Sequence, residues 1–260
     1  MEQRTLVLMY HQIIPEGRSL DWCPSPLADP KYGIGIRAFA RQMLYLRNAG
    51  FLLISLKDWM HGDLPPDLSG KPAVMITFDD GYTSDFDLAA PVLADLGIPS
   101  NFFISTGYLG KEGMLTDSKV HELSRNPLFY VGAHGESHRF LTSLTEEECL
   151  VELTRSIARI RLLTGIRETA MSAPGGRTSP FLVDAAKKTG FWALMTSRPG
   201  LLLPGGDLFS IPRLPIMQRH SQKNFEELLD PQSWVFHFDR CVRSVKQRIR
   251  GMLHIEKIGM

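Results

Sequence analysis

The sequence predicts an α/β fold organised around a parallel β-sheet. Segments rich in β-branched and aromatic residues alternate with segments of helical periodicity, which is typical of parallel strands joined by crossover helices. At 260 residues the chain is long enough for one large α/β domain with a sizeable core. Its 43% apolar and 22% charged residues are those of an ordinary globular protein.

The first half of the chain begins with a short buried strand over residues 5–10, "TLVLMY". A loop rich in Pro, Gly and Asp follows over residues 15–35. Residues 36–49 then place Phe39, Met43 and Leu46 at helical spacing before Gly50, which predicts a packing helix. A strand over 51–56, a short helix and a linker over 62–72 complete this half.

The second half repeats the pattern, with a strand over 73–78, a helix over 83–97 and a strand over 100–105. Thr145 and Glu148 have the spacing of a capping box, which predicts a helix from there to Gly165. We expect a further helix over 179–190, a strand over 191–197 and an extended segment over 209–216. The basic tail, residues 234–260, is predicted to be helical with a solvated charged face.

Charge and hydropathy exclude several classes of protein. The formal net charge is +1, without the basic excess typical of nucleic-acid binding. No apolar run approaches the roughly 20 residues of a membrane span, and we recognise no signal peptide, so we expect a soluble, cytoplasmic protein. The three cysteines, Cys23, Cys149 and Cys241, are far apart and lack metal or redox spacing, so we expect reduced, structural thiols.

Two adjacent carboxylates, Asp79 and Asp80, follow the strand over 73–78 and precede Gly81. Ligand sites of parallel α/β folds form at the carboxyl ends of strands, so this position favours function. Like charges in one pocket repel each other unless a cation lies between them or one carboxylate is protonated. The simpler alternative is that Asp80 caps a helix.

A pair of histidines makes the functional interpretation stronger. His134 and His138 lie four residues apart in "HGESH", a spacing that can present two imidazoles to one divalent metal. With Asp80 they would form a two-histidine, one-carboxylate site that leaves positions for water and substrate. Asp79 would then be available as a base.

The motifs "TFDDG" and "HGESH" together resemble the polysaccharide deacetylase family, also called the NodB-homology or carbohydrate esterase family 4-like proteins. The resemblance extends over "LVLMYHQI", "APGGR" and "IPRLPI", roughly residues 5–217, and is strongest to the subgroup with an amino-terminal MYH strand. It implies a single domain over residues 1–260 that forms a distorted (β/α) barrel of seven strands, with residues 218–260 as a helical extension.

The resemblance also implies an activity and a set of roles. Asp80, His134 and His138 would bind a divalent metal, most often Zn²⁺, with Co²⁺, Ni²⁺ or Fe²⁺ as alternatives. Asp79 would be the catalytic base in the hydrolysis of an N-acetyl group from an amino sugar of a glycan or glycan precursor. A main-chain N–H near Gly175 would hold the oxyanion, and we expect Tyr82 and Trp22 to contact substrate.

Two departures from the family pattern concern catalysis. The third motif commonly carries an Arg two residues before Pro, where this chain has Ser172, and Arg177 or Arg198 is our candidate to replace it. The late motif that usually supplies the general acid is not clearly found near the carboxyl end. In permuted members of the family the equivalent strand sits at the amino terminus, which "LMYH" resembles, so the resemblance implies His11 as the acid, with His237 as the competitor.

Three other functions compete with an N-deacetylase. The missing Arg leaves open a non-catalytic carbohydrate-binding relative that retains the metal. A deformylase of a lipid-linked amino sugar is a near alternative within the same class of hydrolase. A phosphate-handling protein that uses magnesium would prefer oxygen ligands, and the two imidazoles argue against it.

Overall fold

The computed structural model describes residues 4–22, 24–62, 72–233 and 236–237. Its strands are β1 (Thr5–Tyr10), β2 (Ile13–Ile14), β3 (Ile34–Gly35), β4 (Leu53–Ile54), β5 (Ala73–Phe78), β6 (Ser100–Ile104), β7 (Phe129–Ala133), β8 (Met171–Ser172), β9 (Leu194–Met195) and β10 (Leu214–Pro215). Its α-helices are α1 (Ile36–Asn48), α2 (Leu56–His61), α3 (Ala90–Asp95), α4 (Asp117–Arg125), α5 (Glu146–Thr164), α6 (Pro180–Thr189) and α7 (Gln222–Leu228).

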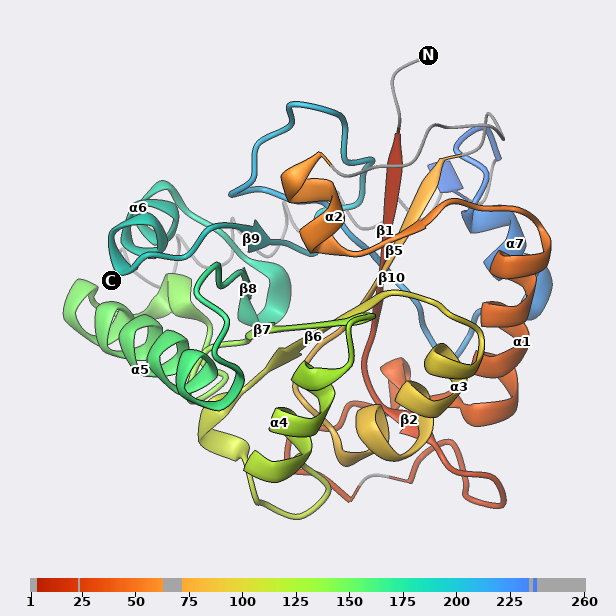
Figure 1. The fold of residues 1–260 in the computed structure, drawn as a ribbon, viewed down its shortest axis with the longest axis horizontal. Coiled ribbons are helices and arrows are strands. Elements are labelled where there is room, and N and C mark those ends of the chain that lie inside the picture. The colour runs from red at the N-terminus through yellow and green to blue at the C-terminus, as the bar shows by residue number, and fades with distance from the viewer. Residues whose placement is uncertain (1–3, 23, 63–71, 234–235, 238–260) are drawn as a thin grey trace, which may run out of the picture.

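The main sheet confirms the predicted parallel barrel. Seven strands of the described chain follow one path in the order β10-β1-β5-β6-β7-β8-β9, and all their pairings are parallel. β4 adds a parallel pairing to β5, and β2 and β3 form a separate small sheet. The sheet curls into a half-barrel, with the helices around the outside of the strands (Figure 1).

The segment from Ile211 to Pro215 links the two ends of this strand path. Ile211 forms a parallel bridge with Met195 of β9, and Leu214 pairs with Leu8 of β1. The residues between these two points are therefore fixed at one end by β9 and at the other by β1. This placement brings a late part of the chain next to β1 and β5.

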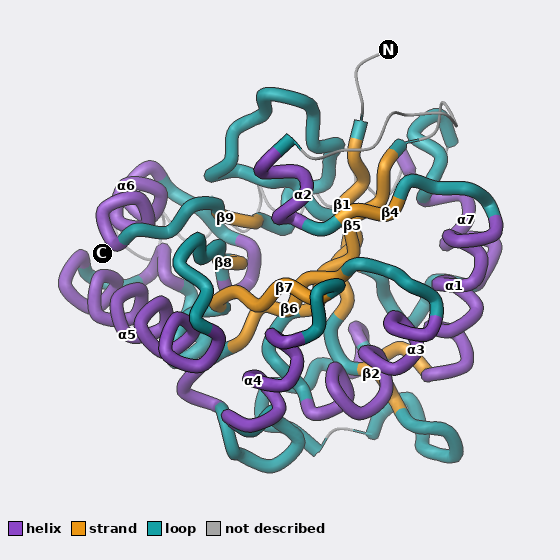
Figure 2. The backbone as a smooth tube through the Cα atoms, viewed as in Figure 1, coloured by secondary structure: helices purple, strands orange, loops and turns teal. Residues whose placement is uncertain are grey.

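Alternation along the strands separates two apolar regions. Val74, Ile76 and Phe78 of β5 belong to the large core beneath the surrounding helices, whereas Ala73 and Met75 belong to a smaller cluster with Ile211. Successive side chains of a strand point to opposite faces, so Thr77 and Asp79 continue the face of Met75. Figure 2 shows the strands gathered in the middle and most of the helical mass outside them.

Most predicted helices and strands are found, with shorter strands late in the chain. The capping box at Thr145 is confirmed, because its hydroxyl accepts from the Glu148 N–H and the Glu148 side chain accepts from the Thr145 N–H. Gly165 ends α5 in the left-handed conformation, as expected. The predicted strands over 51–56 and 191–197 are reduced to two residues each, and α4 is an element that we had not predicted. Helix α7 falls within the helical extension expected over residues 218–260.

The predicted helix over 83–97 is divided into two parts. Residues Asp85–Ala89 form one turn of π-helix, η2, before α3 begins. Pro91 has no N–H to donate to the carbonyl four residues earlier, which favours a wider turn at this point. Most of the predicted tail helix, residues 234–235 and 238–260, lies outside the described residues, as do Cys23 and Cys241.

Candidate active site

Asp79 lies at the end of β5 and faces the inside of the barrel. Its backbone N–H donates to the carbonyl of Tyr10, which continues the β1–β5 ladder by one residue. The side chain is 2% exposed and forms two hydrogen bonds of 2.7 Å with the guanidinium of Arg213. The hydroxyl of Ser172 donates a third hydrogen bond to the carboxylate, at 3.0 Å.

Asp80 turns away from the strand through an uncommon backbone conformation. Its φ is +77°, and Gly81 follows with a φ of +85°. Left-handed conformations at a non-glycine residue are strained and concentrate at functional sites, with Asp among the residues that tolerate them best. The turn lets the two adjacent carboxylates face the same region, as a shared site needs. It begins at Asp80, one residue before Gly81, where we expected it. Asp80 is not the helix cap of the alternative interpretation, because Ser84 is the N-terminal neighbour of η2.

Both predicted histidines approach the carboxylate of Asp80. The Nε2 atoms of His134 and His138 lie 3.3 Å and 3.1 Å from Asp80 Oδ1. His134 follows directly after β7, and its Nδ1 lies 2.9 Å from the carbonyl oxygen of Ser172. A carbonyl only accepts, so Nδ1 carries a proton and donates it, which leaves the Nε2 lone pair of the neutral ring directed to Asp80.

This arrangement fits a divalent cation. One ligand atom from each of Asp80, His134 and His138 lies within 4.8 Å of the others. Asp80 Oδ1 is buried and has no hydrogen-bond partner among the described residues, and the two imidazole nitrogens lie 3.3 Å and 3.1 Å from it. A carbonyl-bound Nδ1–H is also the usual outer contact of a metal-binding imidazole.

The charges of the site act strongly on one another. Burial raises the pKa of Asp79, but the Arg213 guanidinium and His134 more than offset this, so the pKa lies below its ordinary value. Burial acts on Asp80 in the same way, and His134 and His138 hold its pKa well below the ordinary value. For His134, burial favours the neutral ring, yet the two aspartates raise its pKa. Both carboxylates are therefore ionised at neutral pH.

Arg213 is the functional side chain that we missed in the sequence. It is fully buried, and besides Asp79 it donates to the Ser172 hydroxyl at 2.7 Å, the Thr77 hydroxyl at 3.3 Å and the Thr196 carbonyl at 2.9 Å. The two candidates for the missing Arg were wrong. The guanidinium of Arg177 lies over the Phe140 ring and Arg198 donates to Thr178. The signal for Arg213 was a single charge in the apolar extended segment "IPRLPI", two residues after the inward-facing Ile211.

His11 lies at the end of β1, beside the end of β5. Its ring stacks on Tyr32 with centroids 4.4 Å apart, and its Nδ1 is buried without a hydrogen-bond partner among the described residues. Burial lowers the pKa of His11, while the charges of Asp80 and Asp79 act in the opposite direction. His237 is exposed and its ring packs on Phe236. The geometry therefore favours His11 over His237 as the imidazole next to the aspartates.

The three predicted substrate residues have different surroundings. Gly175 has a φ of +66° in the turn after Ala173, and a Cβ there would lie 2.4 Å from the Phe140 ring, so this position requires glycine. The hydroxyl of Tyr82 donates to Asp80 Oδ2 at 2.8 Å from a side chain that is 1% exposed, so it lies against the Asp80 carboxylate. Trp22 is half-buried in the loop after β2, with the Arg18 guanidinium 5.8 Å from its ring.

Comparisons with known proteins agree with this fold. Residues 68–194 match the family model described as polysaccharide deacetylase, a range that includes Asp79, Asp80, His134 and His138 but neither His11 nor Arg213. This match confirms the resemblance of the chain's motifs to the polysaccharide deacetylase family.

Relatives in the family match a larger part of the chain. The poly-beta-1,6-N-acetyl-D-glucosamine N-deacetylase of Staphylococcus epidermidis is 24% identical over 86% of this chain and 81% of its own length. The structure of a polysaccharide deacetylase from Bacillus cereus superposes with a TM-score of 0.74 at 25% identity, over 88% of this chain and 70% of its own. IcaB from Ammonifex degensii gives a TM-score of 0.72 at 25% identity, over 87% of this chain and 96% of its own.

Proposed function

We propose that this protein is a metal-dependent N-deacetylase that removes an N-acetyl group from an amino sugar of a glycan or glycan precursor. The observation that carries the proposal is that the two adjacent aspartates have different partners. Asp80 faces two imidazoles, whereas Asp79 is held by Arg213. This difference supports a role for Asp80 in cation binding and for Asp79 in proton transfer.

Asp80, His134 and His138 would hold the cation in a two-histidine, one-carboxylate site. When bound, a divalent metal would supply Lewis-acid chemistry, lowering the pKa of a water molecule and polarising the amide carbonyl. The mixed nitrogen and oxygen ligands favour Zn²⁺, with Co²⁺, Ni²⁺ and Fe²⁺ as alternatives.

Asp79 would act as the base. Its carboxylate takes a proton from the attacking water as the new C–O bond forms at the amide carbon. Arg213 and Ser172 hold the carboxylate by three hydrogen bonds, so its orientation is set before substrate binds. The Arg213 charge keeps Asp79 ionised, because it lowers the pKa of the carboxyl group.

His11 would act as the acid. In its protonated form it gives a proton to the sugar nitrogen as the C–N bond breaks, which releases acetate and a free amine. Its ring is fixed by stacking on Tyr32, and the buried Nδ1 has no other described partner. The main-chain N–H near Gly175 would donate to the developing oxyanion, and Trp22 would pack on a sugar ring.

The names of several relatives support an N-acetylglucosamine polymer as the first substrate to test. The match to a poly-beta-1,6-N-acetyl-D-glucosamine N-deacetylase extends over most of both chains. The non-catalytic alternative depended on a missing Arg, and the Arg213–Asp79 pair removes that reason for it.

Acetate release tests the proposal. Metal-free protein would be reconstituted with Zn²⁺ or Co²⁺ and incubated with β-1,6-linked N-acetylglucosamine oligomers, chito-oligosaccharides and a nucleotide-linked N-acetylglucosamine. We expect release that requires the metal and stops on chelation. Formate released from N-formylated analogues, with no acetate from any substrate, would instead support the deformylase. Tight metal binding without any acyl release would support the binding relative.

A further inference from the structure

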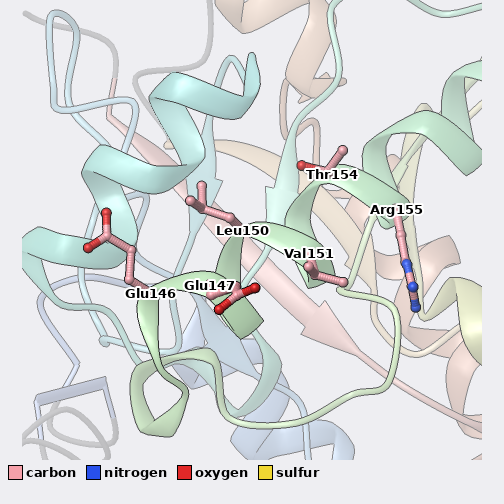
Figure 3. A pocket seen from close by; sticks show the side chains of 6 residues that line it. All are labelled: Glu146, Glu147, Leu150, Val151, Thr154 and Arg155. Carbon is pink, nitrogen blue, oxygen red and sulfur yellow. The ribbon is translucent and has the colours of Figure 1, made fainter.

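Helix α5 has two faces with different surroundings. The outer face carries a shallow pocket of about 540 Å³, lined by Glu146, Glu147, Leu150, Val151, Thr154 and Arg155 (Figure 3). The inner face packs into the core, and among its apolar residues lies one carboxyl group, that of Glu152. Glu152 is only 6% exposed, and neither the predicted motifs nor the proposed reaction uses it.

Glu152 is bound to the loop between the two metal-binding histidines. Its Oε2 accepts from the backbone N–H groups of Glu136 and Ser137, both at 2.9 Å. The Ser137 hydroxyl donates to its Oε1. The carboxyl group therefore makes three contacts with the two residues at the centre of "HGESH".

The same loop is held on its carbonyl side by residues after β6. Thr106 N–H donates to the Gly135 carbonyl at 3.1 Å, and Gly107 N–H donates to the Glu136 carbonyl at 2.9 Å. These bonds leave the N–H groups of residues 136 and 137 to another acceptor, and Glu152 is that acceptor. The loop thus lies between two supports, one for each kind of backbone group.

The loop needs this support because of its backbone geometry. Gly135 has a φ of +73° and His138 a φ of +58°, so the segment returns on itself within four residues. The positive φ at His138 is unfavourable for a residue with a side chain, and surrounding contacts must maintain it. With this backbone geometry, the Nε2 atoms of both imidazoles lie near the same oxygen of Asp80, at 3.3 and 3.1 Å.

We propose that Glu152 is a positioning residue that fixes the histidine loop in its metal-binding form; this inference rests on the proposed function of His134 and His138 as metal ligands. Removing its oxygen leaves two N–H groups without their acceptor and frees the loop to relax. Groups that orient metal ligands typically contribute about 10- to 100-fold to metal affinity.

Cobalt binding followed by visible absorption tests the role without any substrate. The set comprises wild type, Glu152→Ala, Glu152→Gln and Glu152→Asp, with Glu147→Gln as the matched control on the outer face of the same helix. We expect the Ala variant to bind Co²⁺ about 10- to 100-fold more weakly and with an altered spectrum. Gln keeps an acceptor at the right reach and should restore binding to within a few-fold of wild type.

The Asp variant keeps the proposal falsifiable if the Ala variant does not fold. Asp is one methylene shorter, so it should lose the N–H groups and behave like Ala, while Gln behaves like wild type. Unchanged affinity and spectrum in both the Ala and Asp variants would overturn the proposal, as would a wild-type protein that binds no Co²⁺.

The result is separable from that of the deacetylase assay. Tight wild-type Co²⁺ binding that weakens in the Ala variant, without acetate release from any substrate, would leave the role of Glu152 standing and the proposed reaction contradicted. Acetate release together with Co²⁺ affinity insensitive to Glu152 would do the reverse.

Discussion

The guanidinium of Arg213 donates two hydrogen bonds of 2.7 Å to the carboxylate of Asp79, which lies 134 residues earlier in the chain. Both side chains are almost completely buried, so neither charge could remain without the other. Parallel-sheet closure makes this meeting possible, because the segment from Ile211 to Pro215 lies between β9 and β1. The arginine that the third motif lacks at Ser172 is thus supplied by the residue just before β10, and Ser172 bonds to both members of the pair.

Replacing Arg213 by Lys should change the pH dependence of the reaction. Lys keeps a positive charge but cannot form the two parallel bonds. Arg213 lowers the pKa of Asp79, so its loss raises that pKa, and the base becomes protonated at higher pH. We expect kcat/KM to fall about 10- to 100-fold and the acidic limb of its pH profile to move to higher pH.

Arg198→Lys is the matched control, because Arg198 is exposed and bonds only Thr178 among its described side-chain partners. Its profile should follow that of the wild type. An Arg213→Lys profile with an unmoved acidic limb would contradict the role of Arg213 in tuning Asp79. Arg213→Ala is the harsher change, since an unpaired buried carboxylate costs about 3–5 kcal/mol, and it should lower the thermal unfolding midpoint.

His11→Asn should lower kcat by about 10²- to 10⁴-fold if His11 is the acid. Metal affinity should change little, because His11 is not part of the group formed by Asp80, His134 and His138. The control is His237→Asn, which removes the exposed competitor. Loss of turnover in the His237 variant, with normal turnover in the His11 variant, would reverse the assignment.

Asp85→Asn should stabilise the metal-free protein at alkaline pH. Asp85 is fully buried, and burial together with the Asp80 charge raises its pKa well above the ordinary value of 3.8. Its contribution to stability is therefore fully present below that value and is lost as the pH rises towards the folded-state pKa. The variant should unfold at a higher temperature than the wild type at pH 8, and the difference should shrink towards pH 4.

Each kcal/mol corresponds to about 2–4 °C in a domain of this size, so thermal melts at the two pH values can resolve the effect. If the variant is less stable than the wild type at pH 8, the prediction is wrong, and the ionised Asp85 carboxylate forms an interaction that stabilises the folded protein.

Local patterns in the sequence predicted the features that depend on local physics. Alternating strands and helices indicated the parallel sheet, and the capping box at Thr145 marked the start of α5. The spacing of His134 and His138, together with the strand-end position of Asp80, predicted a cluster that the structure brings together. Each of these features can be predicted from the periodicity of a single helix or strand, or from the position of a residue at the end of a strand.

Long-range relationships could not be predicted in the same way. Arg213 joins Asp79 only because the sheet curls until a late segment meets β1, and no local periodicity encodes that closure. Glu152 is one of several charged residues in the predicted helix, and no local pattern shows that its side chain faces the histidine loop.

The described residues include no helix that is long and apolar enough to cross a membrane.

The most direct test of the central claim compares the two adjacent aspartates in one experiment. Asp79→Asn and Asp80→Asn would each be titrated with Co²⁺ and assayed for acetate release from the best wild-type substrate. We predict that the Asp80 variant loses metal binding and activity together, whereas the Asp79 variant binds Co²⁺ nearly as tightly as the wild type but loses at least about 10³-fold in kcat. Equal loss of metal in both variants, or wild-type turnover by the Asp79 variant, would contradict the separation of metal ligand from base.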